Sequence, residues 1–202
     1  GPDYLPGHAH ADTLSFELSL FGHRIFVNSG TSVYGAGTER LRQRGTAAHN
    51  TVVVSGHDSS EVWGGFRVAR RAGPSEVRIA EKRDCLVAEG AHDGYRRLPG
   101  RPMHRRRWSL SAGRLQIADE VAPAAPAEAR FHLHPDVAIE RGEGSHGTLH
   151  LASGEIVGWR ARAAEIRIEE TTWHPEFGRS IPNKCLVLSL SDGRATLDLN
   201  WE

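Results

Sequence analysis

Residues 8–50 read HAHADTLSFELSLFGHRIFVNSGTSVYGAGTERLRQRGTAAHN, and this stretch groups His8, His10, Asp12, Asn28, Tyr34 and His49 around one predicted hairpin. Apolar and polar residues alternate over residues 15–20, which predicts a strand with one buried face. A turn at residues 22–23 leads into the apolar residues 25–27, which predict the returning strand of a hairpin. Residues 28–30, Asn-Ser-Gly, are a turn signal. The two polar ends of the hairpin should therefore meet at its open mouth.

Two histidines and an aspartate precede this hairpin at a spacing of two residues. If residues 8–12 are extended, His8, His10 and Asp12 project to the same side, because side chains two apart on a strand share a face. The small alanines between them leave room for a ligand. This pattern predicts a metal site, although two solvated histidines on an exposed strand would give the same pattern.

His49 is the third histidine that the chain directs to the mouth of the hairpin. It precedes residues 51–54, Thr-Val-Val-Val, which predict a strand. His10 and His49, with an oxygen ligand from Asn28, would suit zinc and leave one coordination position open. Asp12 could replace Asn28 as the oxygen ligand, or it could orient a histidine from outside the ligand set.

These motifs resemble a known enzyme family. HAHADTLSFELSLFGHRIFVNSGTSVYG at residues 8–35 and TAAHNTVVVSGHDSSEVWGGFRV at residues 46–68 are similar to the start of the β-sheet domain of the heparinase II/III-like polysaccharide lyases. The resemblance implies a structural zinc ion with His10, Asn28 and His49 as ligands, where the family commonly has Asp in place of Asn28. His8 and Asp12 would then lie outside the ligand set and orient the ligands by hydrogen bonds.

The resemblance also implies an architecture and a reaction. The family consists of an α/α toroid followed by a stacked antiparallel β-sheet domain, with the polysaccharide between them. Residues 1–202 would be the second part alone, and the chain begins without an initiator Met, so we expect it to start inside a longer protein or after a cleaved segment. The reaction is β-elimination on a uronic-acid-containing polysaccharide, with most acid–base groups in the toroid and Tyr34 as an acid/base from this domain. Family members commonly work in the periplasm or outside the cell.

The composition limits the partners. Lys+Arg and Asp+Glu are both 25 in a chain of 202 residues, so no overall field favours nucleic acid. No apolar run is long enough to span a membrane, and no signal peptide is visible. Cys85 and Cys185 each lie beside apolar strand residues, which favours buried free thiols over a disulfide.

The remaining sequence repeats short alternating segments separated by turns, with a mild helical pattern only at residues 38–44. We therefore expect an all-β, antiparallel, multi-stranded β-sandwich formed by one domain over residues 1–202. His132 and His134 share a strand face, but no third ligand for a second metal site is evident.

Three residues are candidate contacts to an acidic polysaccharide. Trp63 could stack on a sugar ring or belong to the core. Arg67 and Arg105 could bind uronate or sulfate, since a guanidinium matches planar oxyanions, or they could line solvated strand faces. The sequence also allows a non-catalytic alternative, in which the domain only binds saccharide or braces a neighbouring domain.

Overall fold

The computed structural model describes residues 6–202, which form sixteen strands and three short helical segments. The helical segments are the 3-10 turn η1 (Pro6–His8), the helix α1 (Thr38–Arg44) and the 3-10 turn η2 (Thr46–Ala48). The helix predicted at residues 38–44 is confirmed. It ends at Gly45, whose backbone N–H donates to the carbonyls of Leu41 and Arg42.

The strands make up most of the chain. They are β1 (Leu18–Leu20), β2 (His23–Phe26), β3 (Val52–Val54), β4 (Val62–Gly64), β5 (Arg67–Val68), β6 (Pro74–Lys82), β7 (Cys85–His92), β8 (Met103–Ser111), β9 (Arg114–Ala122), β10 (Ala127–His132), β11 (Ala138–Arg141), β12 (His146–His150), β13 (Ile156–Arg162), β14 (Glu165–Trp173), β15 (Ile181–Ser189) and β16 (Arg194–Asn200).

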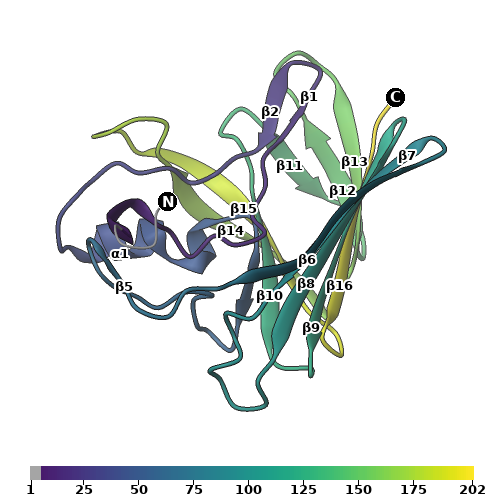
Figure 1. The fold of residues 1–202 in the computed structure, drawn as a ribbon. Coiled ribbons are helices and arrows are strands. Elements are labelled where there is room, and N and C mark those ends of the chain that lie inside the picture. The colour runs from purple at the N-terminus through teal and green to yellow at the C-terminus, as the bar shows by residue number, and fades with distance from the viewer. Residues whose placement is uncertain (1–5) are drawn as a thin grey trace.

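Two antiparallel sheets pack against each other. The larger has eight strands in the order β11-β12-β13-β16-β9-β8-β7-β6, and the smaller has four in the order β14-β15-β10-β3. Two hairpins, β1-β2 and β4-β5, complete the fold. Figure 1 shows α1 and β5 gathered at one side of the molecule and the long strands of the larger sheet at the other. The predicted antiparallel β-sandwich is therefore confirmed.

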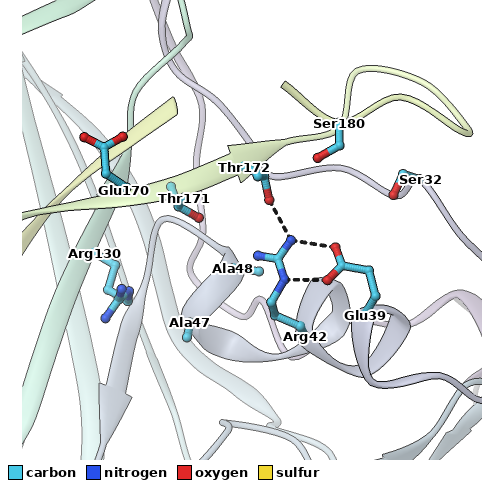
Figure 2. Close-up of a pocket in the computed structure, with 10 residues that line it drawn as sticks. All are labelled: Ser32, Glu39, Arg42, Ala47, Ala48, Arg130, Glu170, Thr171, Thr172 and Ser180. Carbon is cyan, nitrogen blue, oxygen red and sulfur yellow. Dashed lines mark hydrogen bonds and ion pairs between the residues drawn. The ribbon is translucent and has the colours of Figure 1, made fainter. Parts of the chain in front are cut away.

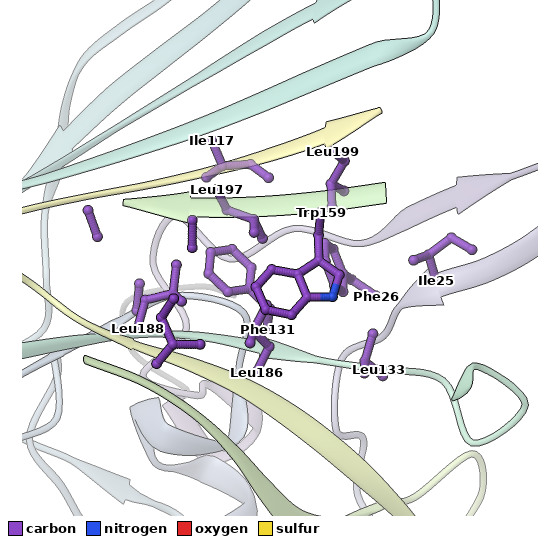
Figure 3. Close-up of a cluster of buried hydrophobic side chains, with 14 of the residues drawn as sticks. Ile25, Phe26, Ile117, Phe131, Leu133, Trp159, Leu186, Leu188, Leu197 and Leu199 are labelled. Carbon is purple, nitrogen blue, oxygen red and sulfur yellow. The ribbon is translucent and has the colours of Figure 1, made fainter. Parts of the chain in front are cut away.

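The core lies between the two sheets. Ile117, Trp159 and Leu197 from the larger sheet meet Phe131 and Leu186 from the smaller one, and all five are at most 2% exposed (Figure 3). Along β9 and β13 the buried residues alternate with more accessible ones, as expected where one face of a sheet is buried, whereas Cys185–Leu188 of β15 are all buried.

The hairpin that the sequence predicts is present as β1 and β2, which pair antiparallel with Leu20 opposite His23. The condition on which a shared face for His8, His10 and Asp12 depended, an extended chain at residues 8–12, is not met: residues 6–8 form η1 and residues 9–12 lie in no strand. The backbone there bonds to the segment around α1 and not to a strand: Ala11 N–H donates to the carbonyl of Arg44, and the Ala11 carbonyl accepts from Thr46 Oγ1 at 2.8 Å. The chain bends at residue 11, and the two histidines contact different residues, His8 the ring of Tyr34 and His10 that of His49.

Both cysteines are free thiols. Cys185 is buried as expected, whereas Cys85 is only partly buried. Among residues 6–202, no helix has the length and apolar character needed to cross a membrane.

Candidate functional site

Two buried arginines of α1 hold the histidine-bearing segment in place. Arg44 donates from Nε to the carbonyl of Ala9 at 2.9 Å and from Nη1 to the carbonyl of Gly64 at 2.6 Å. Arg40, four residues earlier and therefore on the same side of the helix, donates to Thr31 Oγ1 at 3.1 Å. Both side chains are at most 1% exposed, and burial lowers the pKa of each guanidinium. The helix thus fixes the loops on both sides of the site.

His10 and His49 meet at the centre of this arrangement. His10 Nδ1 lies 3.2 Å from His49 Nε2, and the ring centroids are 5.1 Å apart. Burial, with the nearby Arg40 and Arg44, lowers the pKa of His10 to about 4, and burial also lowers the pKa of the fully buried His49. Both imidazoles are therefore neutral at pH 7 and can offer a lone pair.

Asn28 follows β2, as the sequence predicts, and its side chain is engaged locally. Its Oδ1 accepts the backbone N–H of Gly30 at 3.1 Å, which closes the Asn-Ser-Gly turn. Its own backbone N–H donates to Glu17 Oε1 at 3.2 Å. The backbone of Gly30 lies so close to His174 that a Cβ there would sit 1.9 Å from the His174 carbonyl oxygen. The turn is thus fixed tightly, and the amide oxygen keeps one lone-pair direction available.

The histidine pair fits zinc in its separation and protonation. Two ligands bound at ~2.0–2.1 Å around a tetrahedral ion lie ~3.3 Å apart, close to the 3.2 Å between His10 Nδ1 and His49 Nε2. Among residues 6–202, no group of three or more His, Cys, Asp and Glu side chains is arranged to hold a metal ion. A zinc ion at the histidine pair would therefore need a neutral oxygen ligand, and Asn28 is the residue that the sequence predicts for it.

Three exposed rings, those of Tyr34, Phe66 and Phe177, form an aromatic surface beside His8, and a fourth exposed ring, that of Trp63, lies on the same β4-β5 hairpin as Phe66. The Tyr34 ring is 6.1 Å from that of Phe66 and 5.4 Å from that of Phe177, and the four side chains are 50–65% exposed. A Cβ on Gly65 would lie 1.7 Å from the carbonyl oxygen of the loop that carries Tyr34, so glycine allows the two loops to touch. Of the two alternatives for Trp63, the core position is therefore wrong.

Two polar groups adjoin the Tyr34 ring. His8 contacts the ring edge at a centroid distance of 5.9 Å and is exposed to solvent. The Arg40 guanidinium carbon lies 5.1 Å from the centre of the ring. An exposed imidazole, a phenol and a cation together can exchange a proton with a bound molecule and stabilise negative charge on it.

A buried polar network on β7, β8 and β9 supports the site from below. Arg106 bonds both carboxylate oxygens of Asp119, at 2.8 and 2.9 Å, and also donates to the backbone carbonyls of Leu14 and Asn50. These carbonyls belong to the segments that follow His10 and His49. The network thus links the larger sheet to both histidine-bearing segments.

The protons of this network can be assigned. His92 Nδ1 accepts the backbone N–H of Gly94 at 3.2 Å, so its Nε2 donates to His104 Nδ1 at 3.1 Å. The Nε2 of His104 then donates to Asp119 Oδ1 at 2.7 Å. The flanking guanidinium and imidazole hold the pKa of Asp119 at about 2, despite its burial, and burial lowers the pKa of His92 to about 3.

Asn50 is a second link that sequence reasoning missed. Its Nδ2 donates to the carbonyls of Phe16 and Val27, and its Oδ1 accepts the backbone N–H of His132 at 2.6 Å. One side chain therefore joins three segments that lie far apart in the chain. One sequence signal could have indicated this role: Asn50 lies just before an apolar strand, where its side-chain amide is expected to be buried and must then bond to backbone groups.

A cavity of about 780 Å³ lies on the other face of α1. Figure 2 shows that Arg42 enters it, paired with Glu39 and donating to Thr172 Oγ1 at 2.7 Å. Arg42 faces away from Arg40 and Arg44 because residues two apart on a helix point to opposite sides. The cavity is therefore separate from the histidine pair.

A comparison with protein families decides what the chain is. The family Heparinase II/III-like, C-terminal, matches residues 1–202, the whole chain. The chain belongs to this family. This match confirms the family resemblance that the histidine-rich motifs suggested.

Solved structures share the fold of this heparinase-like domain. It resembles the heparan sulfate lyase HepC from Pedobacter heparinus with a TM-score of 0.75 and 15% identity, over 96% of this chain and 31% of that one. It resembles the heparinase III BT4657 gene product with a TM-score of 0.74 and 16% identity, over 96% and 30% of the two chains. The domain thus spans about a third of the length of these proteins. No curated protein sequence matches it.

The heparinase-like domain brings some of the predicted site residues together and separates others. Trp63 and Arg67 lie together on the β4-β5 hairpin, with the Arg67 guanidinium carbon 6.0 Å from the Trp63 ring. Arg105 lies elsewhere: it is exposed on β8, on the face opposite to the buried Arg106. Asp12 is half-buried, and burial raises the pKa of its carboxyl. Among the described residues, that carboxylate bonds neither histidine of the pair.

The second histidine motif does not form a comparable pair. His132 is buried on β10 and its Nε2 lies 3.0 Å from the carbonyl oxygen of Ala47, whereas the Nδ1 of His134 accepts the backbone N–H of Asp136 at 3.2 Å. The two imidazoles thus serve different parts of the backbone, as expected for structural histidines.

Proposed function

We propose that this domain is the β-sheet part of a lyase that cleaves a uronic-acid-containing polysaccharide by β-elimination. It would act with an N-terminal α/α toroid domain of the same parent protein, which fits the 30–31% of the related chains that it spans. The observation that carries the proposal is the exposed pair His8 and Tyr34, held beside buried Arg40 at the edge of the aromatic surface. The family membership supports the choice of reaction class.

The reaction needs a base for the C5 proton of the uronate, an acid for the departing 4-linked oxygen, and charge stabilisation for the enolate-like intermediate. Tyr34 offers a hydroxyl at the surface that can act as acid or base. His8, against its ring edge, offers a second proton acceptor. The positive charge of Arg40 at the same ring favours the anionic form of a bound uronate.

The hairpin β4-β5 would guide the sugar chain to this pair. Trp63 is 65% exposed and presents an apolar ring surface on which a pyranose can stack. The guanidinium of Arg67 lies over that ring and can bind a carboxylate or sulfate. Trp63 and Arg67 would therefore set the register of the polymer relative to Tyr34.

A structural zinc ion remains part of this proposal, with His10, His49 and Asn28 as ligands. When bound, it would fix the Asn28 turn to the His49 segment and so limit the movement of the loop that carries Tyr34. The neutral histidines and their 3.2 Å separation support this assignment. Export to the periplasm or the medium stays a prediction from the family resemblance.

The proposal is tested on the parent protein with an unsaturated-product assay in the ultraviolet. Tyr34→Phe should lower kcat by ~10²-fold or more, because general acid–base groups contribute about that much. Tyr95→Phe is the matched control, since it removes a buried hydroxyl that donates to the Val52 carbonyl, and it should retain kcat. Equal kcat in both variants would contradict the role of Tyr34.

The zinc assignment has its own readout, which does not depend on activity. Elemental analysis should find about one zinc per chain, lost in both His10→Ala and His49→Ala and retained in His132→Gln. Absence of zinc from the unmodified protein would remove the metal from the proposal.

A non-catalytic role is the second candidate. The bond between the Asn28 amide and Gly30 favours it, because that bond gives Asn28 a structural role in the turn that needs no metal. On this view the protein binds acidic saccharide or braces a neighbouring domain, and no product absorbance develops in the parent protein.

A further inference from the structure

The outer face of the larger sheet carries a concentration of arginines that the candidate site does not use. Along β8, His104 and Arg106 point inward and are buried, while Arg105 and Arg107 point outward and are exposed. The same alternation places Arg162 on the outer side of β13, next to the buried Ala161. We call this surface, on β6–β9, β16 and β13, the outer basic face (Figure 1).

The carboxylates on the outer basic face are shared between arginines. Glu120 pairs with Arg194 at 2.6 Å and with Arg105 at 3.7 Å. Asp198 pairs with Arg114 at 2.6 Å and with Arg162 at 3.4 Å. Glu76, at the edge, is a second partner of Arg105. Because single carboxylates serve two guanidinium groups, the paired part of the face retains positive charge.

Three further arginines add to this charge. Within residues 6–202, Arg78, Arg107 and Arg160 are exposed and none makes an ion pair within 4.0 Å. Glu89 stands between Arg78 and Arg107 in the strand register and is opposite both. The whole chain has a net charge of +0, so this excess is a local property of one face.

The register gives the arginines a regular spacing. One cross-strand row runs from Arg78 through Arg107 to Arg162. Arg78 and Arg107 are two strands apart and Arg107 and Arg162 three, which corresponds to about 10 and 14 Å at a strand spacing of ~4.8 Å. Between the last two the row contains only Ala118 and Thr196. Small side chains there leave a shallow path across the strands.

We propose that the outer basic face is a second binding surface for an extended acidic polysaccharide, separate from the candidate site. Guanidinium groups bind carboxylate and sulfate in a planar, bidentate manner, and their repeated spacing over about 24 Å matches a ligand with repeated charges. The choice of polysaccharide rests on the proposed function. The surface would keep a long polymer on the protein while a different part of it occupies the site at Tyr34.

The outer basic face lies on the opposite side of the larger sheet from the buried Arg106, which bonds the segments that carry the histidines of the candidate site. Arg106 turns inward and bonds the backbone carbonyls of Leu14 and Asn50 near the histidines, whereas its neighbours Arg105 and Arg107 turn to the opposite side of the same strand. A ligand on the outer basic face therefore has the thickness of the sheet between itself and Arg106.

The test measures binding of long heparan sulfate chains to the purified protein by titration calorimetry at low and at physiological salt. The variant Arg78→Gln/Arg107→Gln/Arg160→Gln should weaken binding at least about tenfold, since each exposed ion pair contributes up to a few-fold. The control Arg24→Gln/Arg179→Gln/Lys184→Gln removes the same charge from exposed positions elsewhere and should retain the affinity. Unmodified protein should lose affinity as salt rises, because exposed charges are screened.

Two results would overturn the proposal. One is equal affinity of the unmodified protein and the face variant. The other is tighter binding of single-stranded DNA, or of vesicles of phosphatidylserine and phosphatidylcholine, than of heparan sulfate at the same salt concentration. A cleavage assay on a short oligosaccharide, made with the parent protein, separates this proposal from the lyase proposal. The parent protein with the face substitutions should cleave the oligosaccharide normally, and absence of cleavage by the unmodified parent would refute the lyase role without affecting the binding result.

Discussion

Replacement of Asp119 by Asn should destabilise the domain strongly, because it leaves a buried guanidinium without its counter-charge. Arg106 is fully buried, and its two bonds to Asp119 are 2.8 and 2.9 Å long. Breaking a buried ion pair by removing one partner costs about 3–5 kcal/mol. The pKa of Asp119, which the same Arg106 and His104 hold at about 2 against 3.8 when unperturbed, corresponds to ~2 kcal/mol at neutral pH. We therefore expect a loss of at least about 2 kcal/mol in the free energy of unfolding.

The same pKa predicts how the effect depends on pH. Since the folded-state pKa of Asp119 lies below its unfolded value, its stabilisation is complete above about pH 4 and disappears as the pH falls toward 2. The difference between the unmodified protein and Asp119→Asn should shrink over this window. Urea denaturation at pH 7 and at pH 3, followed by tryptophan fluorescence, measures both quantities.

Asp198→Asn is the matched control. Asp198 makes the same kind of pair on the outer side of β16, with partners Arg114 and Arg162 that are 52% and 67% exposed. Ion pairs with exposed partners contribute about 0–1 kcal/mol. If Asp119→Asn costs no more than Asp198→Asn, the view that Arg106 needs its counter-charge is refuted.

Three further predictions concern buried groups. Burial lowers the pKa of His132 to about 4, so the stability contributed by its neutral form is complete above about pH 6.5 and is lost as the pH falls to 4. Thermal unfolding measured against pH should show this loss, of up to about 3 kcal/mol, and the loss should be smaller in His132→Gln. Burial raises the pKa of Cys185 to about 12, so a thiol reagent should modify the partly buried Cys85 first, and Cys185 only on unfolding. Gly65→Ala should lower the free energy of unfolding by about 1–3 kcal/mol, because its Cβ would lie 1.7 Å from the facing backbone, while Gly64→Ala, with only side-chain atoms at 3.4 Å, should cost less.

Local patterns in the sequence were sufficient for most of the secondary structure. The β1-β2 hairpin, α1 and the many short strands follow from alternation and turn residues, which act over a few positions. The same patterns failed at residues 8–12, because Arg44 and Thr46, more than thirty positions away, supply the hydrogen bonds that determine the backbone there.

The candidate site shows the same division. The sequence identified His10, Asn28, His49 and Tyr34 as residues of one loop cluster, and the structure brings His10 against His49. The sequence did not show that His8 would contact Tyr34. That contact depends on where η1 packs and on how the Gly65 loop packs against the loop that carries Tyr34. These are packing decisions between segments that are distant in the chain.

The arginines separate most clearly what sequence and tertiary structure each decide. The sequence allowed two interpretations of the basic stretch around Arg105, a contact to ligand or a solvated strand face; if the stretch is a strand, alternation places Arg106 opposite to Arg105 and Arg107. Only the tertiary structure decided which side is buried, because Asp119 on β9 and two backbone carbonyls more than fifty residues away make burial of Arg106 possible. A charge can leave water only where its partners are already in place, and those partners belong to the assembled fold.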